Sequence, residues 1–170
     1  MPLPFTPRYC AWCGGALVST QGLNPSGPPF YCSACGLPVY EDPKVAAAVI
    51  VHSSQGVLLL RRAQKDGAHG KWILPGGHVD RGEVVPSAAQ REVVEETGLL
   101  VELTSLLGVY SYQGNPWVLV VYTATANGGR LSAGPEALEI RAFAPEELPW
   151  DELGYESTAQ ALKDYLALNP

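Results

Sequence analysis

Three glutamates near the middle of the chain have the spacing that an α-helix brings onto one face. Glu92, Glu95 and Glu96 stand at positions i, i+3 and i+4 within residues 77–99, and residues so spaced are neighbours on a helix surface. Like charges at this spacing repel and weaken a helix, so the cluster favours a partner of opposite charge. Mg²⁺ and Mn²⁺ prefer carboxylate oxygen. The pattern therefore predicts a divalent-metal site of the kind that cleaves phosphate anhydrides.

The three glutamates lie in a segment that carries helix signals at both ends. Residues 85–97 are predicted to be helical, with Pro86 tolerated in the first turn and Gly98 suited to the position after the last turn. Glu83 precedes the helix, where the helix dipole favours negative charge. The planar guanidinium of Arg91 can hold a neighbouring carboxylate in a fixed orientation. The apolar residues expected to face a core are Ala88, Ala89, Val93 and Val94.

Residues 77–99 resemble the Nudix box, which reads Gly-x5-Glu-x7-Arg-Glu-U-x-Glu-Glu-x-Gly-U with U an aliphatic residue. Every fixed position is filled, by Gly77, Glu83, Arg91, Glu92, Val93, Glu95, Glu96, Gly98 and Leu99. So many constrained positions rarely coincide by chance, and a solvated acidic helix is the weaker interpretation. The resemblance is expected to cover residues 44–165. It implies a Nudix hydrolase, which cleaves nucleoside diphosphates linked to another moiety X.

The resemblance also implies roles for individual residues. The ligands of a catalytic Mg²⁺ or Mn²⁺ would be Glu92, Glu95, Glu96 and the backbone carbonyl of Gly76. One of the glutamates would also accept the proton of the attacking water, and Arg91 is counted among the catalytic residues. Glycine at positions 76 and 77 lets the backbone approach metal and phosphate closely, so Gly77 is a predicted substrate contact.

A second resemblance lies downstream, in residues 134–150. Nudix hydrolases of the ADP-ribose and FAD pyrophosphatase type often carry Gly-Pro-Glu-x-Leu-Glu here, followed by a Phe and a Leu-Pro turn, as this chain does. In related enzymes a carboxylate from this loop completes the metal site or assists the water. Glu136 is the candidate for that catalytic role and Glu139 the alternative, although either can be a plain exposed acid.

All four cysteines lie near the start of the chain, as Cys10-Ala-Trp-Cys13 and Cys32-Ser-Ala-Cys35. Two Cys-x-x-Cys pairs at this separation indicate tetrahedral Zn²⁺, because thiolates are its preferred ligands. Two disulfides are the alternative. Since thiolates would fill all four positions around the metal, the zinc is expected to be structural. Residues 21–30, rich in proline and glycine, are predicted to form a loop between the two pairs.

The sequence thus predicts two domains: a zinc ribbon in residues 1–41 and a Nudix domain in residues 42–170. A ribbon of this size cannot fold on burial alone, and metal binding can supply the missing free energy. The first 43 residues carry one cation, Arg8, against Glu41 and Asp42. We therefore expect a scaffolding or dimer-contact role for the ribbon, with no nucleic-acid partner.

The remaining sequence alternates strand-like and helical segments. Strands are predicted at residues 45–52, 57–61, 99–112, 117–126 and 138–144, with turns at 53–56, 113–116 and 127–129, and a closing helix is predicted at residues 157–168. Strands combined with two main helices favour an α/β fold. This agrees with the mixed-sheet α/β/α sandwich that the Nudix resemblance implies.

Several other side chains are candidates for substrate contact. Arg61 and Arg62 end a predicted strand, where either can meet a substrate phosphate or solvent. His69 and His78 have no ligand partner at a useful spacing and are interpreted as surface histidines. The aromatic side chains that can stack a base or a flavin, or else belong to the core, are Phe30, Trp72, Tyr110, Tyr112 and Trp117.

Composition limits the class of partner. The chain has 170 residues, 46% hydrophobic content and a net charge of −6, so it has no electrostatic footprint for general nucleic-acid binding. Apolar runs fall short of the roughly 20 residues that span a bilayer. The proline-rich start lacks the apolar region of a signal peptide. We expect no membrane contact, a cytoplasmic location and, from the family, a homodimer.

The first hypothesis is a Mg²⁺- or Mn²⁺-dependent pyrophosphohydrolase that cuts ADP-ribose or FAD into AMP and a second phosphate. The alternatives are an NADH pyrophosphatase or NAD-cap hydrolase, an 8-oxo-nucleotide triphosphatase, and a non-catalytic nucleotide sensor or partner-binding module. Relatives with NADH pyrophosphatase activity share a four-cysteine ribbon, but they carry Ser-Gln-Pro-Trp-Pro-Phe-Pro after the box. This chain has only Gly114-Asn-Pro-Trp117 followed by Val118. That difference weighs against a nicotinamide dinucleotide preference.

Overall fold

The computed structural model describes residues 7–20 and 27–169, and the chain divides into two compact units, residues 1–43 and 44–170. The proline-rich start and most of the predicted loop between the cysteine pairs lie outside the described residues. Within the described ranges, no helix has the length and apolar character needed to cross a membrane.

The first unit is a three-stranded antiparallel sheet in the order β1-β2-β3. Its strands are β1 (Leu17–Ser19), β2 (Phe30–Cys32) and β3 (Pro38–Val39). Among its described residues, the buried hydrophobic side chains are Cys10, Phe30 and Cys32. So small a core stabilises this unit little by burial.

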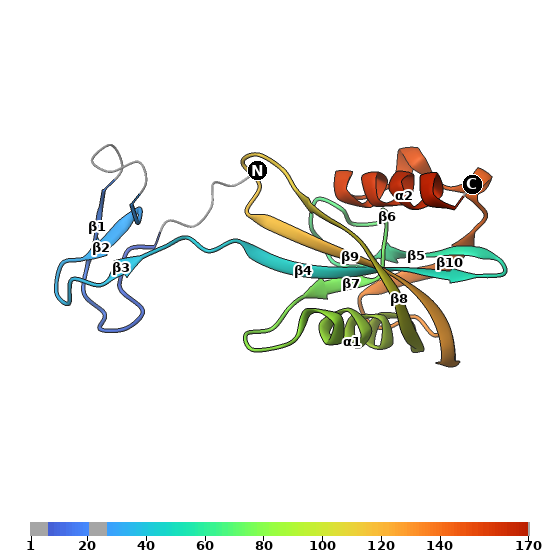
Figure 1. Ribbon diagram of the computed structural model, residues 1–170, viewed down its shortest axis with the longest axis horizontal. Coiled ribbons are helices and arrows are strands. Elements are labelled where there is room, and N and C mark those ends of the chain that lie inside the picture. Colours follow the sequence, from blue (N-terminus) through green and yellow to red (C-terminus); the bar gives the residue numbers. More distant parts are fainter. Residues whose placement is uncertain (1–6, 21–26, 170) are drawn as a thin grey trace. The chain divides into compact units, whose positions relative to one another are not determined.

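The second unit is a mixed sheet between two helices, α1 on one face and α2 on the other (Figure 1). Its main path runs β10-β5-β4-β9-β8, with β6 added to β5 and β7 added to β4. The strands β4 and β9 are parallel, and the other pairs are antiparallel. The strands are β4 (Lys44–Ser53), β5 (Gly56–Arg62), β6 (Trp72–Ile73), β7 (Gly76–His78), β8 (Leu99–Ser111), β9 (Trp117–Gly129) and β10 (Ala137–Phe143).

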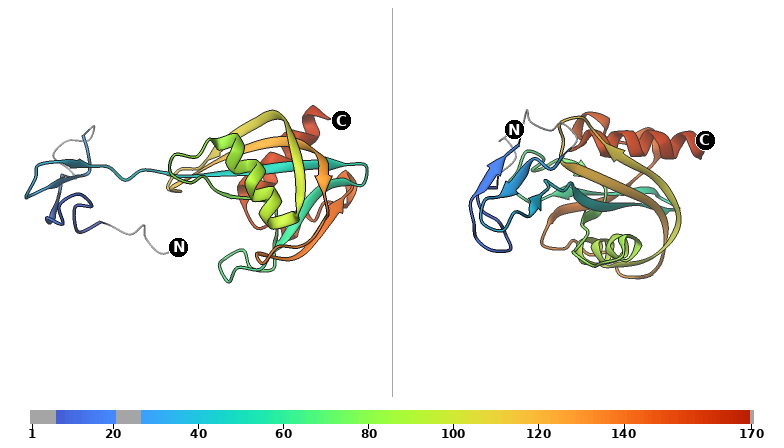
Figure 2. Two further views of the ribbon diagram at one scale, coloured as in Figure 1. Left: turned by 90° about the horizontal axis from the view of Figure 1, so that it is seen from below. Right: turned by 60° about the vertical axis from the view of Figure 1, so that its left-hand side comes forward.

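The helical elements are α1 (Val85–Thr97), α2 (Glu156–Leu168) and the short 3-10 turns η1 (Pro145–Glu147) and η2 (Trp150–Glu152). The predicted α/β fold and both predicted helices are therefore confirmed. Figure 2 shows α1 lying along the sheet from a second direction. The helix ends at Gly98, whose φ of 70° is the left-handed conformation that glycine adopts most easily, and its N–H bonds to the carbonyl of Val94.

Side-chain alternation along β4 explains the two-sided core. Its odd positions Ala47, Val49 and Val51 pack beneath α1, whereas Ala48 and Ile50 belong to the cluster beneath α2. A strand covered on both faces is apolar nearly throughout, which is why residues 45–52 read as a continuous apolar run.

Two details of the sequence-based expectations were wrong. Val94 is 39% exposed, while Ala88, Ala89 and Val93 of the same helix are fully buried, because the helix buries a narrower stripe than its apolar residues suggest. The predicted turn at residues 127–129 is instead the end of β9, where Gly129 pairs with Leu99.

Candidate active site

The glutamates of α1 form the centre of the candidate site. Glu92, Glu95 and Glu96 occupy one side of the helix, and β7 lies against it: a Cβ atom added at Gly77 would come within 2.6 Å of the Glu92 carboxylate. The backbone N–H of Gly76 donates to Glu96 Oε2 over 2.8 Å. The glycines of β7 thus allow the backbone to reach carboxylates that any larger residue would displace.

Arg91 connects the loop before α1 to the carboxylate cluster. Its Nε and Nη2 donate to the two oxygens of Glu83 over 2.8 and 2.9 Å. Its Nη1 donates to Glu92 over 2.8 Å and lies 3.3 Å from Glu95, and Nη2 also donates to the carbonyl of His78 over 2.9 Å. The fork geometry of guanidinium makes this many simultaneous contacts possible.

Electrostatics distinguish the carboxylates. The pKa of Glu96 is raised to about 8, chiefly by burial, and the negative charges of Glu92 and Glu136 act in the same direction. The hydrogen bond from Gly76 opposes this shift. Burial also raises the pKa of Glu92. In contrast, the hydrogen bonds from Arg91 lower the pKa of Glu83 to about 2. The cluster therefore contains buried acids whose ionisation needs a nearby cation.

A second set of residues reaches the cluster from β5, β10 and the loops beside them. Glu136 raises the pKa of both Glu92 and Glu96, so the topology brings it close to them across about 40 residues of sequence. Its carboxylate accepts a hydrogen bond from Gln64, a residue that the sequence analysis did not single out. No local sequence signal could have found Gln64, because the contact joins two loops.

The two adjacent arginines at the end of β5 point in different directions. Arg62 bonds to Asp66 and Gln64, and its positive charge acts on Glu96. Arg61 instead donates to the carbonyl of Gly70 over 2.8 Å. Its other neighbours are Trp72, with the guanidinium 6.0 Å from the ring centre, and Glu139, 3.8 Å away. Of the pair, Arg62 is thus the one directed toward the carboxylates.

Oxygen donors suited to a hard cation are present in this cluster. Carboxylates and backbone carbonyls are the donors that Mg²⁺ and Mn²⁺ prefer. Burial is the main cause of the raised pKa values of Glu92 and Glu96, and a bound cation would offset it. The donor types therefore suit a divalent metal, while among the described residues only the four cysteines bring three or more ligand atoms within 4.8 Å of one another.

The cysteines form a separate cluster in the first unit. All four are free, and their Sγ atoms lie within 4.8 Å of one another. The Cys10–Cys35 and Cys13–Cys32 separations are 3.9 and 3.4 Å, close to the roughly 3.8 Å edge of a tetrahedron with Zn–S bonds of about 2.3 Å. Backbone N–H groups of Gly15 and Cys35 lie 3.4 and 3.5 Å from sulfur. This arrangement is consistent with a zinc ribbon.

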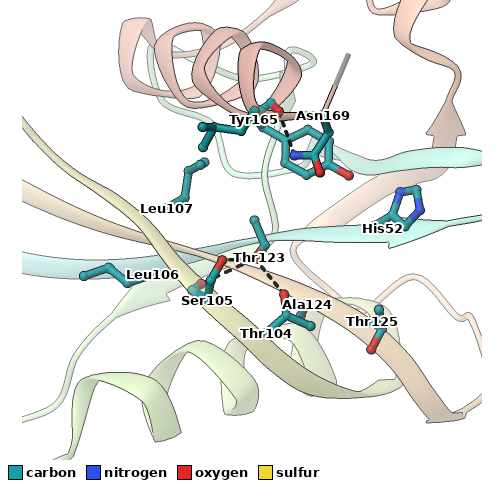
Figure 3. A pocket seen from close by; sticks show the side chains of 11 residues that line it. His52, Thr104, Ser105, Leu106, Leu107, Thr123, Ala124, Thr125, Tyr165 and Asn169 are labelled. Carbon is teal, nitrogen blue, oxygen red and sulfur yellow. Dashed lines mark hydrogen bonds between the residues drawn. The ribbon is translucent and has the colours of Figure 1, made fainter.

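A hollow of about 330 Å³ lies on the α2 face of the sheet (Figure 3). It is lined by His52, Thr123, Tyr165 and Asn169 among others, and the hydroxyl of Thr123 lies 2.7 Å from those of Thr104 and Ser105. His52 is near the far end of β4, whereas β7 pairs with residues 46–48 of that strand. The predicted site residues do not line this hollow.

The fold and the glycine-backed carboxylate helix define the class of hydrolases that act on phosphate anhydrides. Residues 42–165 match the NUDIX domain family, and the chain belongs to that family as a Nudix hydrolase. It is 36% identical over 132 residues to an ADP-ribose pyrophosphatase of Methanocaldococcus jannaschii, covering 75% of this chain and 76% of that protein.

Two further likenesses bear on the family assignment. An 8-oxo-dGDP phosphatase of Mus musculus is 34% identical over 72% of this chain, a match that spans 36% of the mouse protein. The crystal structure of a Nudix hydrolase from Nitrosomonas europaea is 30% identical, with a TM-score of 0.84, and the match covers 95% of this chain and 91% of that one.

Proposed function

We propose that the chain hydrolyses the diphosphate of nucleoside diphosphate–X substrates of the ADP-ribose or FAD type, with Mg²⁺ or Mn²⁺ as cofactor. The observation that carries the proposal is the carboxylate cluster of α1, in which Glu96 is buried and bonded to the backbone of β7. The similarity of the chain to the archaeal ADP-ribose pyrophosphatase, over three quarters of both chains, favours ADP-ribose over other nucleoside diphosphate–X substrates.

The metal-binding residues in this proposal are Glu92, Glu95 and Glu96 with the carbonyl of Gly76. A bound divalent ion would neutralise the bridging phosphates and lower the pKa of a water molecule. In the hydrolysis of ADP-ribose, a water oxygen would form the new bond to phosphorus, the bond from phosphorus to the bridging oxygen would break, and AMP and ribose 5-phosphate would be the products. Glu136, beside the cluster and outside α1, is assigned to accept the water proton.

Other residues hold the reacting groups in place. Arg91 fixes the orientation of Glu92 through its 2.8 Å contact. Arg62 supplies positive charge toward the carboxylates and is the better phosphate contact. The neighbours of Arg61 support a structural role in the loop that follows β5. Gly77, where a Cβ atom would lie 2.6 Å from the Glu92 carboxylate, lets the backbone approach that carboxylate and remains a proposed phosphate contact.

Substitution of the most buried carboxylate tests this assignment. Glu96→Gln keeps the shape and the hydrogen-bonding oxygen but removes the charge that binds metal, so ADP-ribose hydrolysis with Mg²⁺ is expected to fall by about 100-fold or more. Chromatography of the products should show AMP and ribose 5-phosphate in the parent. Hydrolysis by Glu96→Gln at the parent rate would contradict the proposal, and Glu102→Gln, at an exposed position of β8, is the matched control.

Likeness to the mouse 8-oxo-dGDP phosphatase supports a second candidate substrate, an oxidised purine nucleotide. An 8-oxo-nucleoside diphosphate would release inorganic phosphate and its triphosphate would release pyrophosphate, so product analysis separates them from ADP-ribose. The NADH pyrophosphatase or NAD-cap alternative is supported by the ribbon and opposed by the missing downstream motif. Tight ADP-ribose binding without turnover in any divalent metal would instead support a nucleotide sensor.

The remaining parts of the proposal concern the whole chain. We assign structural zinc to Cys10, Cys13, Cys32 and Cys35, with residues 1–41 as the ribbon and 42–170 as the catalytic domain. The charge of −6 supports a small-molecule substrate over nucleic acid. A homodimer in the cytoplasm is the assembly and location we propose.

A further inference from the structure

Two rings meet on the face of the sheet opposite the α1 carboxylates. β7 and β9 flank β4: His78 pairs with Ala46 and Trp117 pairs with Lys44. The rings of His78 and Trp117 contact each other edge to face, with centroids 4.7 Å apart and planes at 66°. Paired residues in adjacent strands project to the same side of a sheet, so both rings lie on the same face as Ala46. Alternation along β4 makes this the face that carries α2, because Ala48 and Ile50 belong to the cluster beneath that helix.

This ring pair is open to solvent. His78 is exposed and Trp117 is 37% exposed, although both belong to strands of the main sheet. Ala46, which lies between them, is half-buried, whereas the next residues of β4, Ala47 and Ala48, are buried. The two rings therefore offer an exposed aromatic surface next to the small side chain of Ala46.

The ring pair adjoins the edge of β7 that carries the carboxylate cluster, since the N–H of Gly76 bonds to Glu96 at that edge. His78 directly follows Gly77, whose Cα borders the Glu92 carboxylate, and neighbouring Cα atoms are about 3.8 Å apart. The carbonyl of His78 is held by Arg91 over 2.9 Å. Lys44 is exposed, and strand alternation places it on the same face as Ala46, so a positive charge borders the rings.

We propose that His78 and Trp117 form the subsite for the planar heteroaromatic ring of the substrate, with Lys44 attracting the adjoining phosphate. This subsite rests on the proposed function, and it assigns substrate preference to a ring pair outside the carboxylate cluster. The base stacks on the exposed ring surface, and the diphosphate passes around the edge of β7 to reach the carboxylates on the other face. Stacking on an aromatic face accepts any base, so the pair selects substrates with a ring at this end and discriminates little among rings.

Steady-state kinetics with ADP-ribose tests the subsite. In Trp117→Ala and His78→Ala we expect KM to rise about tenfold, the loss that removal of one base–aromatic stack produces, with kcat within about twofold of the parent. Trp117→Phe should retain most of the affinity, because it keeps an aromatic face. Trp150→Ala, which removes a tryptophan of similar exposure at 39%, is the control and should keep the parent KM.

Inhibition by the two products separates ring binding from phosphate binding. AMP carries a heteroaromatic base and ribose 5-phosphate does not. Trp117→Ala should therefore raise the inhibition constant for AMP about tenfold and leave that for ribose 5-phosphate unchanged. Equal KM and equal AMP inhibition in parent, Trp117→Ala and His78→Ala would overturn the subsite while leaving the hydrolase intact. If the parent fails to hydrolyse ADP-ribose, the proposed function fails, and calorimetric titration of parent and Trp117→Ala with AMP still decides the subsite.

Discussion

At the scale of single residues, Gly77 controls how closely the backbone approaches the carboxylates of α1. A methyl group at this position would meet the Glu92 carboxylate at 2.6 Å. Because that carboxylate is the end of a flexible side chain, Gly77→Ala should displace it without unfolding the protein. We expect kcat/KM to fall about tenfold or more, with weaker Mg²⁺ dependence, measured by initial rates over a metal titration. Gly67→Ala, which meets no heavy atom within 4 Å, should leave both unchanged.

Glu96 makes the stability of the metal-free protein depend on pH. Burial raises its pKa from 4.5 to about 8, so between these values the folded protein binds a proton that the unfolded chain has released. Raising the pH through this window therefore lowers the free energy of unfolding, by at most about 5 kcal/mol. Glu83 acts at the other end: its lowered pKa of about 2 contributes stability that is lost as the pH falls below 4.5.

Urea unfolding of the metal-free protein at pH 5.5 and pH 8.5 measures this effect. The parent should be less stable at the higher pH, Glu96→Gln should lose most of that difference, and Mg²⁺ should restore stability chiefly at pH 8.5. A parent protein equally stable at both values, with no difference from Glu96→Gln, would show that the Glu96 carboxylate is not desolvated as described.

At the scale of elements, the Arg91 contacts join the loop before α1 to the helix itself. Lysine keeps the charge but cannot bond to Glu83, Glu92 and the His78 carbonyl together. Arg91→Lys should therefore lower kcat/KM about tenfold or more while the helical circular dichroism is retained. The control is Arg141→Lys, since Arg141 and its partner Glu147 are both more than half exposed. Parent-like kinetics in Arg91→Lys would mean that charge alone is sufficient.

Sequence patterns predicted the long elements because their periodicity is strong. The helix at 85–97 and the strand run at 45–52 carry complete burial patterns, and the box places its glutamates on α1. The two-residue and three-residue strands β6 and β7 were not predicted, because elements so short have no periodicity to detect. Sequence order also could not show that Glu136 lies beside Glu92 and Glu96, since that proximity depends on the pairing of β10 with β5.

His78 shows a related limit. It is exposed, as the sequence predicted for a histidine without a metal partner, yet it contacts Trp117. That contact arises because β7 and β9 both pair with β4, one antiparallel and the other parallel. Pairing of two strands with a third leaves no local pattern in the sequence. The sequence alone therefore could not show that the two rings meet.

At the scale of the whole molecule, the two units have different sources of stability. The unit of residues 44–170 has an apolar cluster under each helix, whereas the described part of the first unit buries few hydrophobic side chains. We propose that metal coordination by the four cysteines is the main term that holds the small sheet together. The N–H of Cys35 lowers the pKa of Cys32 to about 6. Despite the hydrogen bond from Gly15, the neighbouring cysteines raise the pKa of Cys13 to about 12, so ionisation of all four thiols requires a bound cation.

Removing one sulfur ligand should therefore unfold the ribbon and spare the catalytic unit. For the full chain with Cys10→Ser, we expect mass spectrometry to show loss of one zinc per chain, and calorimetry to show loss of the ribbon transition. The transition of residues 44–170 should remain within about 2 °C of the parent, because its two clusters form within that unit. Ala11→Ser places a serine hydroxyl at the exposed position directly after Cys10. This variant should retain zinc and both transitions. A parent protein that is purified without zinc, and whose ribbon melts as Cys10→Ser does, would contradict metal-dependent folding.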